Sequence, residues 1–112
     1  MSQKGYVKVT QTSEIPTGSM KMIKVGETEL LLINVNGKFY AMANRCSHAR
    51  GNLSKGTLEG TTVTCPRHGS VFDVTSGKSI KGPKILGIRR KTKDLPTYDV
   101  QIENEDLFVK VP

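Results

Sequence analysis

The sequence predicts an all-β protein, and three observations favour this fold class. Short runs that alternate apolar and polar residues fill both ends of the chain, and Gly, Pro, Asn and Asp separate them. No segment shows a helical periodicity of convincing length. The 112 residues are enough for a single domain whose core needs no disulfide. We therefore expect an antiparallel β sandwich or barrel framework, into which one lobe is inserted.

The N-terminal part of the chain contains three predicted strands and the clearest hairpin. The strands occupy residues 6–9, 20–25 and 27–35. In the stretch "LLINVNGKFYAM", Asn36 and Gly37 tolerate the positive φ angles that a tight two-residue hairpin turn requires. We therefore expect the third strand to fold back on the next one at this point.

The C-terminal part predicts a second hairpin. Residues 98–102 and 107–111 are typical of strands, and the acidic segment "ENED" between them predicts a looser turn. Residues 1–43 and 85–112 together form the expected β framework of a single domain that spans residues 1–112.

Residues 44–84 differ in composition from both ends of the chain. They are rich in Gly, Ser, Thr and Pro and poor in large apolar side chains. Such a segment has little core of its own, and bonds from its side chains to a metal can replace the missing core. We therefore expect an inserted lobe at 44–84 that a metal centre holds in place.

Charge and aromatic content narrow the classes of partner. The chain has 17 Lys and Arg against 10 Asp and Glu, a formal net charge of +7, which favours an acidic partner. Three Tyr, three Phe and no Trp are a poor supply of stacking platforms, so we expect no nucleic-acid partner. No apolar run is long enough for a signal peptide or a membrane span. We expect a cytoplasmic protein whose reduced thiols are free to bind metal.

All cysteines and histidines of the chain lie in one short window, in the order Cys46, His48, Cys65 and His68. Residues i and i+2 of an extended loop point the same way, so Cys46 and His48 can face one site. Pro66 stiffens the turn that brings Cys65 and His68 together. Two interpretations remain open from the residues alone. The four side chains hold either one tetrahedral zinc ion or, with two irons, a binuclear iron–sulfur cluster.

The motif C-x-H, followed after 16 residues by C-x-x-H-G, resembles the ligand motif of Rieske proteins. The flanking segments "NGKFYAMANRCSH", "GTLEGTTVTCPRHGSVFDVTSGK" and "LPTYDVQIENEDLFVKV" are also similar to those of Rieske ferredoxins, so the resemblance covers nearly the whole chain. It implies one [2Fe–2S] cluster per chain, with the four side chains named above as its ligands. The protein resembles soluble Rieske-type ferredoxins of the low-potential class, and an archaeal protein of this type is among the identities that the resemblance allows.

Four positions refine this resemblance. Rieske subunits of quinol-oxidising complexes carry one further cysteine in each ligand loop, and the corresponding places hold Gly51 and Arg67. Ser70 matches a serine that hydrogen-bonds a cluster sulfide, whereas Phe72 replaces a tyrosine whose hydroxyl would reach a ligand sulfur. Because hydrogen bonds to sulfur stabilise the added electron, we expect a potential in the lower half of the Rieske range of about −150 to +300 mV.

Two groups of basic residues are candidates for docking. Arg45, Arg50 and Arg67 lie within or beside the ligand loops, so positive charge surrounds the expected exit of the electron. Residues 84–94 are interpreted as a basic insertion after a proline loop that begins at Gly82, and they form either a solvated turn or a second contact surface. We expect redox partners, a reductase and a terminal acceptor, with an acidic docking face.

The resemblance implies an electron carrier rather than an enzyme. With both histidines assigned to the cluster, none remains for the mononuclear iron of an oxygenase or for general base catalysis. No glycine-rich loop is present for a nicotinamide or flavin. The expected function is one-electron transfer between a reductase and an oxygenase or other redox enzyme. The alternatives are a small Rieske subunit of a larger enzyme complex and a zinc-stabilised interaction module.

Overall fold

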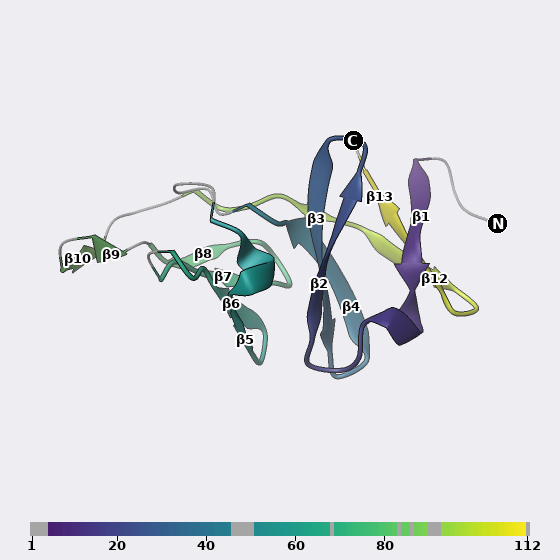
Figure 1. The fold of residues 1–112 in the computed structure, drawn as a ribbon, viewed down its shortest axis with the longest axis horizontal. Helices are drawn as coiled ribbons and strands as arrows, with labels where there is room; N and C mark the ends of the chain where they lie inside the picture. The colour runs from purple at the N-terminus through teal and green to yellow at the C-terminus, as the bar shows by residue number, and fades with distance from the viewer. Residues whose placement is uncertain are drawn as a thin grey trace.

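The structure is a computed structural model that describes residues 5–45, 51–67, 69–82, 84–85, 87–89 and 93–111. It confirms the prediction of an antiparallel all-β fold (Figure 1). Within these residues the helical elements are two short 3₁₀ turns, η1 (Thr12–Glu14) and η2 (Leu53–Lys55). No helix of the described part is long and apolar enough to cross a membrane.

Three sheets are stacked along the longest dimension of the molecule, 49 Å (Figure 1). The terminal sheet has the order β1 (Tyr6–Gln11), β13 (Asp106–Lys110), β12 (Val100–Glu103). The middle sheet has the order β11 (Thr97–Tyr98), β4 (Lys38–Ala43), β3 (Thr28–Val35), β2 (Met20–Val25). The lobe sheet has the order β5 (Thr57–Glu59), β6 (Thr62–Thr64), β7 (Val71–Asp73), β8 (Ser79–Lys81).

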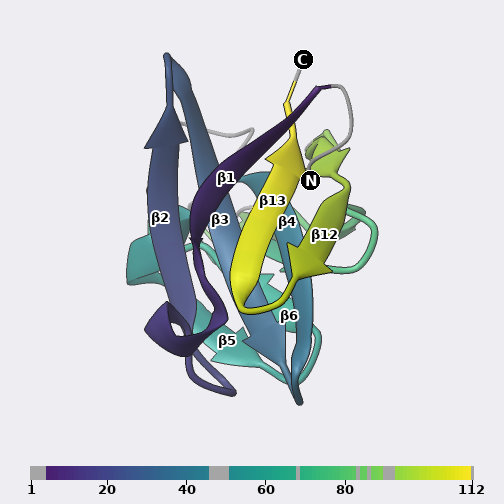
Figure 2. The ribbon, with the colours of Figure 1, turned by 90° about the vertical axis from the view of Figure 1, so that its right-hand side faces the viewer.

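The middle sheet is buried on both faces, which explains the unbroken apolar run of β3. Successive side chains of a strand point to opposite faces. Leu30 and Leu32 pack with the terminal sheet in one core, which includes Leu107. Leu31 and Ile33 pack with the lobe in a second core. Figure 2 shows the terminal sheet in front of the middle sheet and β5 and β6 behind it. A strand between two layers needs apolar residues at every position.

The hairpin predicted between β3 and β4 is confirmed. Val35 pairs with Lys38, and the two residues between them have φ angles of 53° at Asn36 and 89° at Gly37. These positive angles match the twist of the strands and select Asn and Gly. The side chain of Asn34 supports the turn by accepting a hydrogen bond from the backbone N–H of Gly37 at 2.8 Å.

The C-terminal hairpin is tighter than expected. Glu103 pairs directly with Asp106, so the turn consists of two residues rather than the whole acidic segment. Asn104 adopts a positive φ of 58°, which Asn tolerates better than most residues. The prediction of a loose acidic turn was therefore wrong, because the first and last residues of "ENED" belong to the strands.

The inserted segment has more core than its composition suggested. Leu53, Val63, Phe72 and Val74 are fully buried, and they pack against the face of the middle sheet that carries Leu31. The expectation of little core was therefore wrong. Most of the few apolar residues of this segment point inward, with Ile80 an exposed exception, and the middle sheet supplies the other half of the core.

After the lobe sheet the chain forms a short pair of strands, β9 (Lys84–Ile85) and β10 (Ile88–Arg89). Figure 1 shows this pair beyond the lobe sheet, at the end of the molecule farthest from β1. The chain then returns to the lobe, where the N–H of Leu95 donates to the carbonyl of Gly77 at 2.7 Å. The role of residues 84–94 as a contact surface stays a prediction.

The two-sided burial of the middle sheet predicts different costs for two neighbouring positions. Leu31 and Met22 are paired in register on the same face, but Leu31 is fully buried and Met22 is 36% exposed. Leu31→Ala should lower the free energy of unfolding by about 2–5 kcal/mol. Met22→Ala should lower it by about 1 kcal/mol or less. Denaturant unfolding followed by circular dichroism measures both, and equal losses would contradict the cover of this face by the lobe.

Candidate metal centre

Cys65 lies in a tight loop that joins β6 to β7. Thr64 pairs with Val71, so the loop comprises residues 65–70. The N–H of Cys65 donates to the carbonyl of Ser70 at 2.7 Å, and the N–H of Gly69 donates to the carbonyl of Cys65 at 3.1 Å. Gly69 has a φ of 77°, a conformation that glycine adopts without strain. These bonds fix the backbone on both sides of the thiol.

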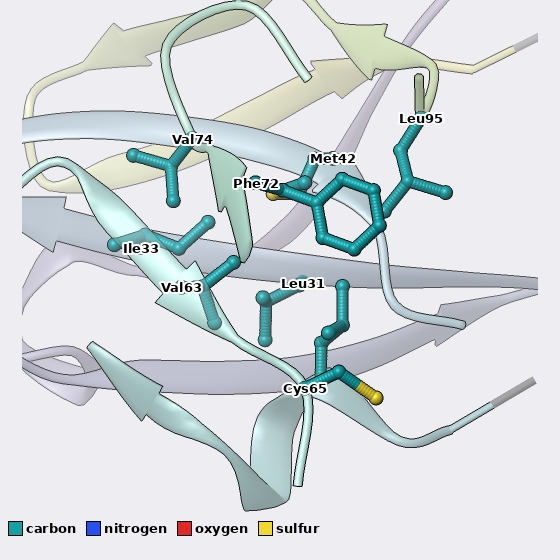
Figure 3. Packing of buried hydrophobic residues seen from close by; sticks show 9 residues of the cluster. Leu31, Ile33, Met42, Val63, Cys65, Phe72, Val74 and Leu95 are labelled. Atoms are coloured by element: carbon teal, nitrogen blue, oxygen red, sulfur yellow. The ribbon is translucent and has the colours of Figure 1, made fainter. Parts of the chain in front are cut away.

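The thiol of Cys65 sits at the edge of the core that the lobe shares with the middle sheet. The residue is 2% exposed and forms no disulfide. Figure 3 shows Cys65 below Leu31 and Val63, with its sulfur directed away from both. A thiol in this position can donate to a metal beside the core without displacing an apolar contact.

The backbone at Gly51 packs directly against this sulfur. A Cβ atom on Gly51 would lie 2.5 Å from the Sγ of Cys65 and 3.3 Å from the Cβ of Arg67. No side chain fits at the first of these distances unless the sulfur moves. The structure therefore brings together Gly51 and Arg67, the two positions that correspond to the further cysteines of Rieske subunits in quinol-oxidising complexes. Glycine therefore allows the end of the first loop to pack this closely against the thiol.

Ser70 provides a hydrogen-bond donor that the described residues do not use. The residue is 1% exposed, and its Oγ has no hydrogen-bond partner within the part of the chain that the structure describes. A buried hydroxyl without a partner costs about 1–3 kcal/mol. A cluster sulfide beside Cys65 would accept this hydrogen bond, so the buried thiol and the unused hydroxyl both fit an iron–sulfur cluster.

Phe72 packs in the core rather than against solvent. Its side chain is fully buried and belongs to the same apolar cluster as Cys65 (Figure 3). Phe72 is therefore a packing residue of this core. Its aromatic ring offers no hydroxyl to a ligand sulfur.

The first predicted ligand loop begins and ends in a polar network. Arg45 forms an isolated antiparallel bridge with Asn52, across residues 46–50. The Nε of Arg45 also donates to the carboxylate of Glu29 at 2.9 Å. The hydrogen bonds from Arg45 and Asn44 hold the pKa of Glu29 below its usual value. Part of the positive charge expected at Arg45 is therefore offset by Glu29.

Only part of the predicted ligand set lies within the described residues. Cys65 is placed as described above, whereas Cys46, His48 and His68 fall outside, as does Arg50. Within the described residues, no three His, Cys, Asp or Glu side chains are grouped closely enough to hold a metal ion. The complete set of four ligands stays a prediction. Sequence analysis overlooked Glu29, Asn44 and Asn52, because nothing in their spacing connects them to the loop.

Comparison with known proteins agrees with this geometry. The sequence matches the Rieske [2Fe–2S] domain family over residues 5–99. The chain belongs to this family. As a Rieske domain it carries one [2Fe–2S] cluster, so the prediction of the cofactor is confirmed.

Two curated relatives of this Rieske domain are similar over almost their whole length. The ferredoxin component of naphthalene 1,2-dioxygenase/salicylate 5-hydroxylase systems from Ralstonia sp. is 36% identical over 106 residues, 95% of either chain. The ferredoxin component of a naphthalene 1,2-dioxygenase system from Pseudomonas aeruginosa is 33% identical over 104 residues, 93% of either chain. Among solved structures, a chain in the complex of reduced oxygenase and oxidised ferredoxin in carbazole 1,9a-dioxygenase superposes with a TM-score of 0.83. The two chains are 28% identical, with 96% of this chain and 94% of that chain covered.

The contact between Gly51 and Cys65 predicts that a methyl group disturbs the Rieske centre. Gly51→Ala should displace the Cys65 sulfur and accelerate the loss of iron to a chelator by roughly tenfold. The rate is measured from the decay of visible absorbance. Gly26→Ala is the control, since Gly26 has a φ of +60° and no neighbour within 4 Å of its Cβ position. It strains a distant turn without touching the sulfur. Equal rates of iron loss for both variants would contradict the assignment of Cys65 to the Rieske centre.

The unused hydroxyl predicts a role in tuning the Rieske potential. Ser70→Ala should lower the reduction potential by an amount on the order of tens of millivolts, because one hydrogen bond to the reduced cluster is lost. Protein-film voltammetry measures the shift. Ser19→Ala removes a hydroxyl that bonds the carbonyl of Pro16, outside the lobe, and should leave the potential unchanged. A Ser70→Ala protein with the parent potential would show that the hydroxyl does not face the cluster.

Proposed function

We propose that this protein is a Rieske ferredoxin, which carries single electrons from a reductase to an oxygenase or similar redox enzyme. The observation that carries this proposal is the similarity over 93–95% of both chains to ferredoxin components of dioxygenase systems. The structural similarity to a chain of an oxygenase–ferredoxin complex supports the same function. We propose that the protein works in the cytoplasm, where thiols stay reduced, and that the chain itself catalyses no bond-making reaction.

We propose Cys46, His48, Cys65 and His68 as the ligands of the cluster. The burial of Cys65 and the unused hydroxyl of Ser70 support one end of this set. When bound, the cluster takes up and releases one electron. The protein excludes water from the Cys65 side, since Leu53 and Phe72 of the same apolar core are fully buried.

The docking face lies at the lobe end of the molecule. The lobe forms one end of a three-layer stack, so a partner can approach it without meeting the terminal sheet (Figure 1). Arg67 is exposed and lies against Gly51, two residues from the buried thiol. Arg45 is paired with Glu29, and for this reason we now assign the main attraction of an acidic partner to Arg67.

Metal analysis tests the proposed function against its alternatives. The proposal expects two irons and two acid-labile sulfides per chain, together with reversible one-electron reduction. One zinc and no sulfide would instead indicate an interaction module. Co-purification with a catalytic subunit would favour a dedicated subunit of a larger enzyme complex.

Exposed positive charge near the cluster predicts an electron-transfer rate that depends on salt. The Debye length shrinks to about 8 Å at physiological ionic strength, so steering of an acidic partner weakens as salt is added. Arg67→Glu should slow the bimolecular reduction by its reductase and weaken the salt dependence without loss of colour. The matched control is Lys110→Glu, which reverses an exposed charge on β13 of the terminal sheet. Stopped-flow measurements give the bimolecular rate of each protein as a function of salt concentration. A salt-insensitive rate that both variants share with the parent would contradict docking through Arg67.

A further inference from the structure

The two ends of the first ligand loop are tied together by a network of three polar side chains. Asn44 and Arg45 precede residues 46–50, and Gly51 and Asn52 follow them. The bridge between Arg45 and Asn52 brings the two ends side by side. The N–H of Leu53 also donates to the carbonyl of Asn44 at 2.9 Å. The loop therefore starts and finishes at one place in the fold.

Asn44 is the centre of this network. It is fully buried, and both polar atoms of its side chain are used. The Nδ2 donates to the Oδ1 of Asn52 at 2.9 Å and to the Oε1 of Glu29 at 3.3 Å. The Oδ1 accepts a hydrogen bond from the backbone N–H of Ser54 at 3.0 Å. A buried amide with every partner in place has one low-energy orientation.

Glu29 connects this network to the middle sheet. It lies in β3, and its backbone carbonyl accepts a hydrogen bond from the N–H of Asn44 at 3.2 Å. Its carboxylate accepts from Asn44 and from Arg45 at the same time. The side chain of Glu29 is 24% exposed, so these bonds are partly shielded from water. The entry to the loop is thereby fixed to a strand that is buried on both faces.

Asn52 connects the network to the exit of the loop. Its Oδ1 accepts three hydrogen bonds, from Asn44 and from the backbone N–H and hydroxyl of Ser54 at 3.1 and 2.6 Å. All three bonds use the oxygen of the amide, and an aspartate at this position offers an oxygen in the same place.

We propose that Glu29, Asn44 and Asn52 form a loop clamp, which fixes both ends of the first ligand loop and thereby positions the ligands that the loop carries. The proposal rests on the assignment of Cys46 and His48 under the proposed function. The three residues are positioning residues, since they act on the cluster through the backbone of the loop. The clamp ties the two ends of this loop to each other and to β3 through side-chain hydrogen bonds.

Two variants of Asn52 test the clamp, of which the first leaves the net charge unchanged and the second adds one negative charge. Asn52→Ala removes the accepting oxygen without changing the net charge, so any change at the cluster must come from the geometry of the loop. We expect iron loss to a chelator to be roughly tenfold faster, together with shifted or broadened g values in the electron paramagnetic resonance of the reduced protein. Asn52→Asp keeps the accepting oxygen and should restore both the parent rate of iron loss and sharp g values.

A second pair of variants separates the clamp from general destabilisation. Glu29→Gln weakens the clamp, and Glu14→Gln makes the same substitution in the Glu14–Lys21 ion pair. All variants are studied as cluster-loaded protein, with thermal unfolding and amide hydrogen exchange at Leu53 and Ser54. Glu29→Gln should release iron several-fold faster than Glu14→Gln and increase exchange at these two amides.

The outcomes separate this inference from the proposed function. A parent protein without iron and sulfide would overturn both. If the parent protein binds the cluster and Asn52→Ala keeps the parent's g values and rate of iron loss, the clamp alone would be overturned. A Glu29→Gln protein that matches Glu14→Gln, or an Asn52→Asp protein that behaves like Asn52→Ala, would also overturn it.

Discussion

The burial of one sheet on both faces is the constraint on which this structure depends. Four successive residues of β3, from Leu30 to Ile33, are inaccessible to solvent and belong alternately to two cores. The middle sheet is therefore stable only when the terminal sheet covers one face and the lobe covers the other. Since buried apolar side chains contribute about 1.5–3 kcal/mol each, loss of either layer would expose a large part of the core. The lobe is thus a structural layer as well as the part of the chain that contains the proposed ligands.

The candidate metal centre takes its rigidity from this layered core. Cys65 directly follows β6, whose central residue Val63 is fully buried, and it belongs to the core that the lobe shares with β3. The first ligand loop begins just after β4 and is tied by Asn44 to Glu29 of β3. Both ligand loops therefore start from elements that pack on the same sheet. This common support gives a segment rich in Gly, Ser and Thr a fixed attachment to the middle sheet at both places.

Phe72 and Ser70 show how stability and redox chemistry share a few positions. Phe72 is completely buried in the core and offers no hydrogen bond to sulfur. Ser70 is also buried, but its hydroxyl has no partner among the described residues. An unused buried hydroxyl is unfavourable in the polypeptide alone, and a cluster sulfide turns it into a favourable contact. Arg45 and Arg67 also differ in their surroundings. One is bound into the loop network by Glu29, and the other extends over Gly51 at the surface.

The sequence by itself determined the fold class, the hairpin at Asn36 and Gly37, and the membership of the family, because these depend on local patterns and on spacing along the chain. The acidic turn and the amount of core in the lobe were predicted wrongly, since composition does not reveal which residues pair or point inward. Only the tertiary structure showed that Arg45 is paired, that Gly51 touches the Cys65 sulfur, and that Glu29 supports the first ligand loop. Glu29 is separated from Arg45 by 16 residues, and their contact exists only because β3 and β4 fold against each other.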